Sequence, residues 1–166
     1  MSPSRDIWLP MLLACALVSG GCGYSSESLI DTRYKTVYVE TFENDTRYRG
    51  FEVSLTRALI NQINAKTDLR IVPREQAETV ITGRIADFRQ HVLTEDENDN
   101  VRETEVRIFV DMTWTDQRTG RPIKVVRNMG AAEQIKWELG QTLESETVEL
   151  FRDLGEKLVE RMEAAW

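Results

Sequence analysis

Cysteine is almost absent from this chain: Cys15 and Cys22 lie near its start, and none follows. The rest of the sequence can therefore form no disulfide and offers no thiolate to a metal or a substrate. His91 is the only histidine, so histidine-based zinc sites and catalytic pairs lack their partners. These shortages argue against a zinc protein and against an enzyme that depends on cysteine or histidine.

Other patterns of catalytic and metal sites are missing as well. The sequence has no glycine-rich phosphate loop, no serine-centred nucleophile elbow and no carboxylate–histidine cluster. Asp96, Asn98 and Asn100 resemble the start of a calcium loop. However, Val101 stands where the turn glycine is needed, and Arg107 stands where the bidentate glutamate should be. We therefore expect no catalytic residue, no metal and no cofactor.

Basic residues are fewer than acidic ones. The chain has 21 Lys and Arg against 28 Asp and Glu, which gives a formal net charge of −7. Proteins bind nucleic acids largely by neutralising phosphates with basic side chains, so this balance argues against a nucleic-acid partner. It leaves room for a local basic patch that contacts an anionic lipid headgroup.

The one apolar run near the start, residues 7–18, follows Arg5 and ends in small residues. It is shorter than the roughly 20 residues that span a bilayer as a helix. A charged start, an apolar middle and a small-residue cleavage site are typical of a secretory signal peptide. We interpret residues 1–21 as a signal peptide, 22–34 as a polar tether and 35–166 as a single domain.

A cysteine at the end of such a segment indicates a bacterial lipoprotein, whose thiol is acylated and becomes the new N-terminus. Cys22 is the preferred site because it leaves a longer apolar segment and a polar mature start. Cys15 is the less favoured alternative: Leu12 fits the lipoprotein consensus, but apolar residues 16–18 would then begin the mature protein. An ordinary cleaved signal without lipid is the third possibility.

The pattern of apolar residues predicts several strands and two helices. β-Branched and aromatic residues, or alternation of apolar and polar residues, indicate strands over residues 36–42, 69–72, 79–92, 105–115 and 123–127. Apolar residues at helical spacing predict helices over residues 50–64 and 143–165. We expect a β-bulge at Gly83, irregular structure over residues 128–141, and close packing of the helices at Gly155.

Neither a helix with one apolar stripe nor a sheet with one apolar face can bury that surface alone. The sequence therefore predicts an α+β fold. Two helices would pack on one face of a four- to five-stranded, mostly antiparallel sheet.

Basic residues on the predicted strands are the candidate ligand-binding residues. They could gather on the solvated face of the sheet and hold phosphates through charge-assisted hydrogen bonds. These residues are Arg84, Arg89, Arg102, Arg107 and Lys124. The favoured alternative is that they form ion pairs with Glu103, Glu105 and Asp111 across the strands.

Several segments resemble the LptE family of lipopolysaccharide-assembly lipoproteins. In chain order they are residues 22–26, 37–44, 55–60, 77–85 and 164–166. The resemblance implies two helices on a four-stranded sheet. It also implies a lipid-anchored protein at the periplasmic face of the outer membrane, which contacts lipopolysaccharide and acts as plug and folding partner of a β-barrel translocon. The lipopolysaccharide-contacting residues of the family cannot be placed here by motif.

The Val-x-x-Phe-x-Asn pattern over Val39–Asn44 keeps a second interpretation open. Other periplasmic lipoproteins of similar build share such a strand end followed by a helix. On this interpretation the protein would activate a cell-wall synthase or act as a scaffold in a secretion complex.

Overall fold

A computed structural model of the chain describes residues 33–97, 101–137 and 143–163. The elements follow one another as β1 (Thr36–Val39), β2 (Glu43–Asn44), α2 (Phe51–Lys66), β3 (Arg70–Ile71), the short 3₁₀ helix η1 (Arg74–Gln76), β4 (Thr79–Glu95), β5 (Val101–Asp116), β6 (Pro122–Lys136) and α3 (Leu143–Glu163). The predicted α+β class is confirmed. Cys15, Cys22, the signal peptide and nearly all of the tether lie outside the described residues, and the predictions about them remain predictions.

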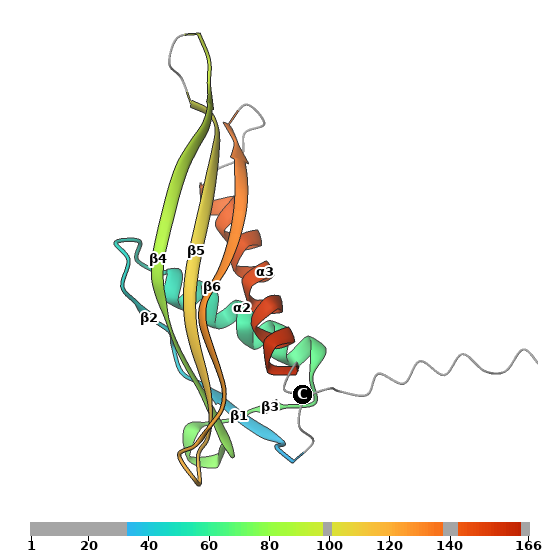
Figure 1. Cartoon of the computed structure of the whole chain (residues 1–166). Coiled ribbons are helices and arrows are strands. Elements are labelled where there is room, and N and C mark those ends of the chain that lie inside the picture. Colours follow the sequence, from blue (N-terminus) through green and yellow to red (C-terminus); the bar gives the residue numbers. More distant parts are fainter. Residues whose placement is uncertain (1–32, 98–100, 138–142, 164–166) are drawn as a thin grey trace, which may run out of the picture.

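The sheet combines long antiparallel strands with short parallel ones (Figure 1). Its six strands are arranged in the order β3-β1-β4-β5-β6, and β2 pairs with β4 beside this path. β4, β5 and β6 form two antiparallel ladders, whereas β1, β2 and β3 make only parallel pairs. The sheet is thus more mixed than predicted. The cause is the connection through α2, because a crossover helix brings the strands on either side of it into parallel alignment.

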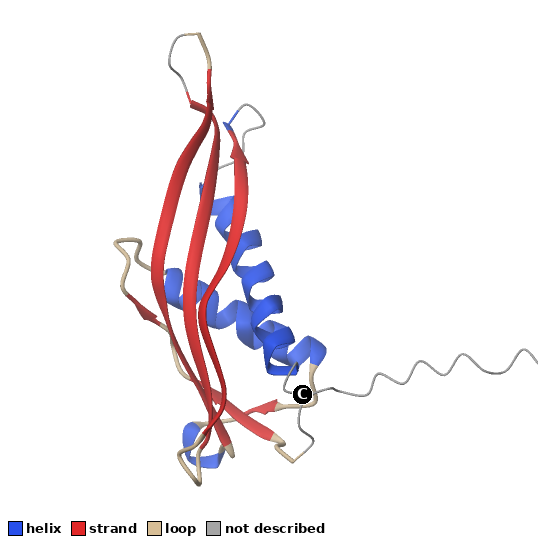
Figure 2. Cartoon of the chain, viewed as in Figure 1, coloured by secondary structure: helices blue, strands red, loops and turns tan. Residues whose placement is uncertain are grey.

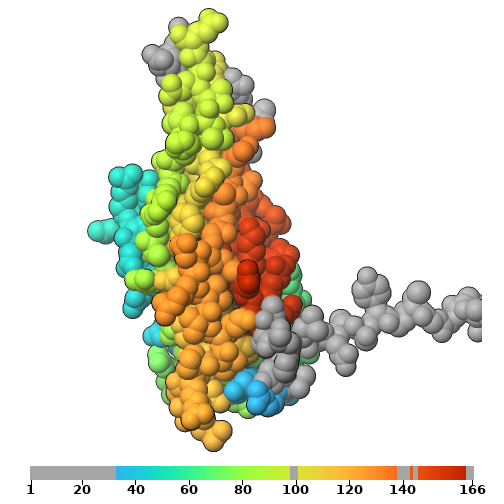
Figure 3. Space-filling model, in the orientation of Figure 1, coloured from blue at the N-terminus to red at the C-terminus, as the bar shows by residue number. Residues whose placement is uncertain are grey.

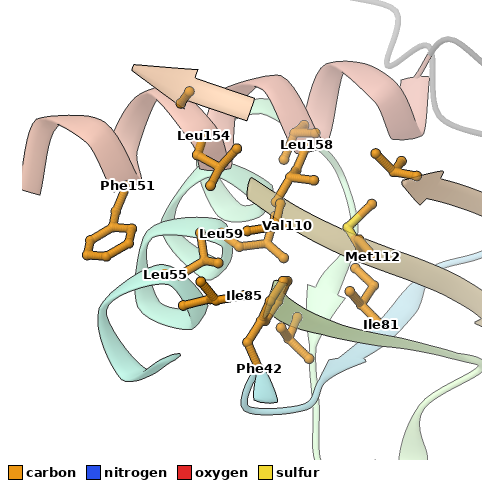
Figure 4. Close-up of a cluster of buried hydrophobic side chains, with 14 of the residues drawn as sticks. Phe42, Leu55, Leu59, Ile81, Ile85, Val110, Met112, Phe151, Leu154 and Leu158 are labelled. Atoms are coloured by element: carbon orange, nitrogen blue, oxygen red, sulfur yellow. The ribbon is translucent and has the colours of Figure 1, made fainter. Parts of the chain in front are cut away.

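The core lies between the long strands and the two helices, which cover the same side of the sheet (Figure 2). Along β5, every second side chain from Val106 to Trp114 is buried. The helices contribute matching apolar stripes, among them Leu55 and Leu59 of α2 and Leu154 and Leu158 of α3 (Figure 4). Burial of each such side chain stabilises the fold by about 1.5–3 kcal/mol, so this layer accounts for most of the favourable free energy.

Gly155 allows the two helices to touch through their main chains. A Cβ atom at this position would lie 3.2 Å from the carbonyl carbon and oxygen of Ala58 in α2. The expected close approach at Gly155 is confirmed, and it explains why a poor helix former stands in the middle of α3.

The prediction of irregular structure over residues 128–141 is wrong for residues 128–136, because β6 continues to Lys136. Its two halves are joined by an irregularity at Arg127 and Asn128, where Asn128 has a positive φ of 50°. Beyond it come Gly130 and two alanines, which have low strand propensity. They pair with β5 nevertheless, because tertiary contacts with the neighbouring strand outweigh that local preference.

Gly83 lies in regular pairing opposite Met112, so the bulge expected there is wrong. The register of β4 shifts further along, between Ile85 and Asp87. Gly83 is needed for a different reason. A Cβ atom there would lie 2.7 Å from the carbonyl oxygen of Asp111 and would overlap the buried ring of Phe42.

We predict that Gly83→Ala lowers the free energy of unfolding by about 1–3 kcal/mol, because the added methyl group overpacks this contact. Urea unfolding of the full chain measures the effect. Thr82→Ala, at the neighbouring half-buried position, serves as the control and should cost less. Unchanged or increased stability of Gly83→Ala would contradict the packing described here.

Candidate functional site

The candidate functional site is the outer face of the sheet, which we define as the side of β4, β5 and β6 that the helices leave uncovered. On β5 this face carries the residues that alternate with the buried ones. They are Glu105, Arg107, Phe109, Asp111 and Thr113. The paired strands add Arg84, Asp87, Arg89 and His91 from β4 and Gly130, Ala132 and Gln134 from β6. The outer face is therefore polar and rich in charges of both signs.

The structure brings together only part of the predicted basic cluster. Arg84, Arg89 and Arg107 lie on the outer face. Lys124 pairs in register with Trp114, whose side chain is buried under the helices, so Lys124 projects to the other side of the sheet. Arg102 alternates with the outer-face residues of β5 and likewise belongs to the helix side, where it forms an ion pair with Asp96 at 2.8 Å.

The three outer-face arginines all have carboxylate neighbours. Arg84 donates from Nε and Nη2 to Asp111, at 3.0 and 2.9 Å. Arg89 bonds Asp87 at 2.6 Å, and Arg107 bonds Glu105. The favoured alternative, pairing with carboxylates across the strands, is confirmed for Arg84 and Asp111 alone. Arg107 pairs with Glu105 of its own strand, and Arg89 pairs with Asp87 of its own strand, a partner that was not predicted. Whether these arginines also bind a ligand remains a prediction.

Asp111 is the residue that organises the centre of this face. One of its oxygens accepts the Asn128 backbone N–H at 2.8 Å, which holds the irregular point of β6 in place. The other oxygen accepts Arg84. The Asn128 amide and then the Arg84 guanidinium hold the pKa of Asp111 below its usual value. In turn, the hydrogen bonds that Arg84 donates to Asp111 raise the pKa of Arg84. The sequence singled out Asp111 only as an ion-pair partner.

A shallow depression of about 560 Å³ opens where the β1–β2 connection meets the outer face. Its charged lining residues are Glu40, Glu43, Arg84, Asp111 and Arg127. The part of the chain that the structure describes has no cluster of three or more residues suited to a metal ion. The depression can therefore accept and donate hydrogen bonds and ion pairs, but its residues form no recognisable catalytic arrangement.

Phe109 interrupts the polar outer face, as it interrupts the alternation in the sequence. Its ring lies beside Gly130 of β6, where an added Cβ atom would be 3.1 Å from the ring edge. The guanidinium of Arg89 sits 5.2 Å from the ring centre. This cation–π contact and the glycine together cover much of the ring, so Phe109 is half-buried although it points away from the core.

We predict that Asp111→Asn lowers the free energy of unfolding at pH 7 by about 1 kcal/mol, because the charge-assisted hydrogen bonds are weakened. The folded-state pKa of Asp111 is lowered, so its carboxylate stabilises the fold above the ordinary value of 3.8. That contribution is lost as the pH falls through the lowered pKa. Urea unfolding at pH 7, 4 and 2.5 should show the variant and the natural chain converging at the acid end.

The matched control is Asp87→Asn, which makes the same chemical change in an exposed ion pair on the same face. It should cost clearly less at pH 7, since such pairs contribute little. Equal losses in the two variants, or a difference that does not depend on pH, would contradict the role of Asp111.

Within the described part of the chain, every helix is too short or too polar to cross a membrane. A search of curated protein sequences finds no match.

The fold is similar to those of solved bacterial lipoproteins. The solution structure of an uncharacterized lipoprotein B from Nitrosomonas europaea matches with a TM-score of 0.55 and 17% identity, over 79% of this chain and 83% of that one. The crystal structure of a minor lipoprotein from Acinetobacter baumannii matches with a TM-score of 0.54 and 16% identity, over 80% and 94% of the two chains. At these identities the likeness concerns the fold alone.

The family of the chain is shown by its sequence. Residues 34–163 match the model of the lipopolysaccharide-assembly family LptE, and this range includes every helix and strand described above. The chain therefore belongs to the LptE family of lipopolysaccharide-assembly lipoproteins.

Proposed function

We propose that this protein is a lipoprotein of the outer membrane, that it works at the periplasmic face, and that it is the plug and folding partner of a β-barrel lipopolysaccharide translocon. Family membership supports a role in lipopolysaccharide assembly. It also favours a binding and scaffolding role over a catalytic one.

The observation that carries the proposal is the contrast between the two faces of the long sheet. One face is buried under the helices, and the other is polar, with its arginines paired to carboxylates on the same surface. The lumen of a large outer-membrane barrel is itself lined by polar residues. A rigid polar sheet suits such a lumen, because its charges keep their partners when water is displaced.

The end of the sheet where β4 ends and β5 begins gives a second argument for a protein partner. In Figure 1 this end projects beyond the two helices. Val92 and Leu93 there are each 43% exposed, and Val101 on the adjacent strand is also exposed. Apolar residues gathered on a projecting element are typical of an interaction site.

The lipid anchor is part of the proposal. Acylation of Cys22, or less favourably of Cys15, would attach the domain to the membrane through the short tether that ends at Tyr34. Membrane attachment by lipid generally needs more than one chain for stability, which a modified cysteine at a lipoprotein N-terminus provides.

Lipopolysaccharide is the proposed ligand. Arg84, Arg89 and Arg107 on the outer face could exchange their intramolecular ion pairs for phosphate groups, which bind guanidinium strongly. Lys124 cannot join them, because it projects to the other side of the sheet.

The alternative function, activation of a cell-wall synthase or scaffolding of a secretion complex, is the less favoured one, since the family match points to lipopolysaccharide assembly. Its motif has a structural explanation here. Val39 and Phe42 are buried in the core. Asn44 closes the following turn by donating to the Tyr48 carbonyl at 2.7 Å and accepting the Thr46 N–H at 2.9 Å.

Affinity purification of the tagged full chain from detergent-solubilised envelope tests the proposal. We predict that a large outer-membrane β-barrel and lipopolysaccharide copurify with it. Arg107→Glu combined with Thr113→Glu, which places new negative charge on the outer face, should reduce the yield of the barrel at least severalfold. Val53→Glu, on the exposed surface of α2, is the control. Recovery of a peptidoglycan synthase in place of a barrel would contradict the proposal.

A further inference from the structure

Among the described strands β6 is the last one of the sheet, and one side of its main chain pairs with none of them. On the face shown in Figure 3, β6 (orange) lies in front and α3 (red) lies beside it. A groove of about 560 Å³ runs between them, along residues 124–130 of β6 and the C-terminal half of α3. We call this the basic groove.

The charge of the basic groove is opposite to that of the chain. Four basic side chains line it, Lys124, Arg127, Lys157 and Arg161, against the single acidic residue Glu160. The chain as a whole has a net charge of −7. Such a local excess of positive charge is the feature that attracts an acidic ligand.

Two of these cations, Arg127 and Arg161, form no ion pair with the described residues, although Arg127 is close enough to Asp111 for its charge to help lower the pKa of that carboxylate. Both arginines are exposed. Arg84, Arg89 and Arg107, in contrast, each form an ion pair on the outer face. Lys157 pairs with Asp153 at 2.7 Å, on the same helix.

The cations are spread along the groove and do not converge on one point. Lys157 and Arg161 are one helical turn apart, with Cβ atoms separated by about 5–6 Å. Lys124 and Arg127 are three residues apart on the strand, which corresponds to about 10 Å. A single phosphate would contact only one or two of them, whereas an extended chain with several carboxylates could contact all four.

We propose that the basic groove binds a short, acidic, extended segment of a partner protein, which pairs its main chain with the free edge of β6. Strand addition at an open sheet edge supplies main-chain hydrogen bonds, and the flanking basic side chains select acidic residues. The irregularity at Arg127 and Asn128 limits the regular length of the edge. It therefore favours a short segment over the edge of another large sheet.

The test uses the full chain purified in a non-ionic detergent and a fluorescently labelled ten-residue peptide of alternating Glu and Thr. Fluorescence anisotropy measures binding. We predict that Arg127→Glu combined with Arg161→Glu weakens binding at least tenfold. Arg57→Glu combined with Arg152→Glu makes the same change in net charge at a different groove, on the outer surface of α2 and α3. This control should change binding less than threefold.

Amide hydrogen exchange tests the strand pairing separately. At saturating peptide, exchange should slow in β6 but not in α2. If the peptide binds without slowing exchange in β6, the paired geometry is wrong. If both double variants lose binding equally, the attraction is not local to the groove.

A lipid ligand is the remaining outcome that would overturn the proposal. Phosphatidylglycerol vesicles and lipopolysaccharide are tested with the same variants. Failure of the peptide to bind, together with lipid binding that Arg127→Glu and Arg161→Glu abolish, would show that the groove takes anionic lipid. Arg127 also lines the outer-face depression, whereas Arg161 lines only the basic groove. Arg161→Glu alone should therefore weaken peptide binding and leave copurification of the barrel unchanged, which separates a failure of this proposal from a failure of the proposed function.

Discussion

The structure depends on the packing of the helix pair against one face of the three long strands. The inward side chains of β5 from Val106 to Trp114 are buried almost completely, and α2 and α3 supply the apolar surface that covers them. Gly155 permits the two helices to approach closely enough to form one layer. Because side chains alternate along a strand, this burial fixes which residues face outward.

On the outward surface, Arg84, Arg89 and Arg107 are already paired with carboxylates. Asp111 links all three long strands, since it sits on β5, accepts Arg84 of β4 and holds the Asn128 amide of β6. This arrangement keeps the face both polar and rigid. The groove between β6 and α3 differs from it, because Arg127 of β6 and Arg161 of α3 form no ion pair with the described residues. One small domain thus presents a charge-paired sheet face and a basic groove, and these suit different partners.

The elements with strong local signals could be predicted from the sequence. The alternation in β5 and the apolar stripes of both helices identified the core and the α+β class, because those patterns are fixed by the surfaces that must be buried. The second half of β6 could not be predicted, since Gly130 and Ala132 have low strand propensity and the pairing depends on a neighbour. The change of apolar face along β4 predicts a bulge at Gly83, but the register shifts after Ile85. The glycine is there because Phe42 and the Asp111 carbonyl leave no room for a side chain, and such contacts cannot be recognised from the sequence of one strand.

The arrangement of the charged residues on the outer face could not be predicted from residue type alone. Arg84, Arg89 and Arg107 share the outer face. Lys124 projects to the opposite side of the sheet, because it pairs directly with Trp114, whose side chain is buried there. The role of Asp111 depends on a contact with Asn128, 17 positions away, and no local pattern indicates it.

Cysteine labelling would test the central claim most directly. Single cysteines at Arg107 and Thr113, on the outer face, are compared with one at Ile108 on the buried face. A membrane-impermeant maleimide is applied to the purified chain and to envelopes whose periplasmic side is open. The account predicts that positions 107 and 113 react in the purified chain but are protected in envelopes, and that position 108 is protected in both. Equal reaction of positions 107 and 113 in the two samples would contradict it, because the outer face would then have no partner.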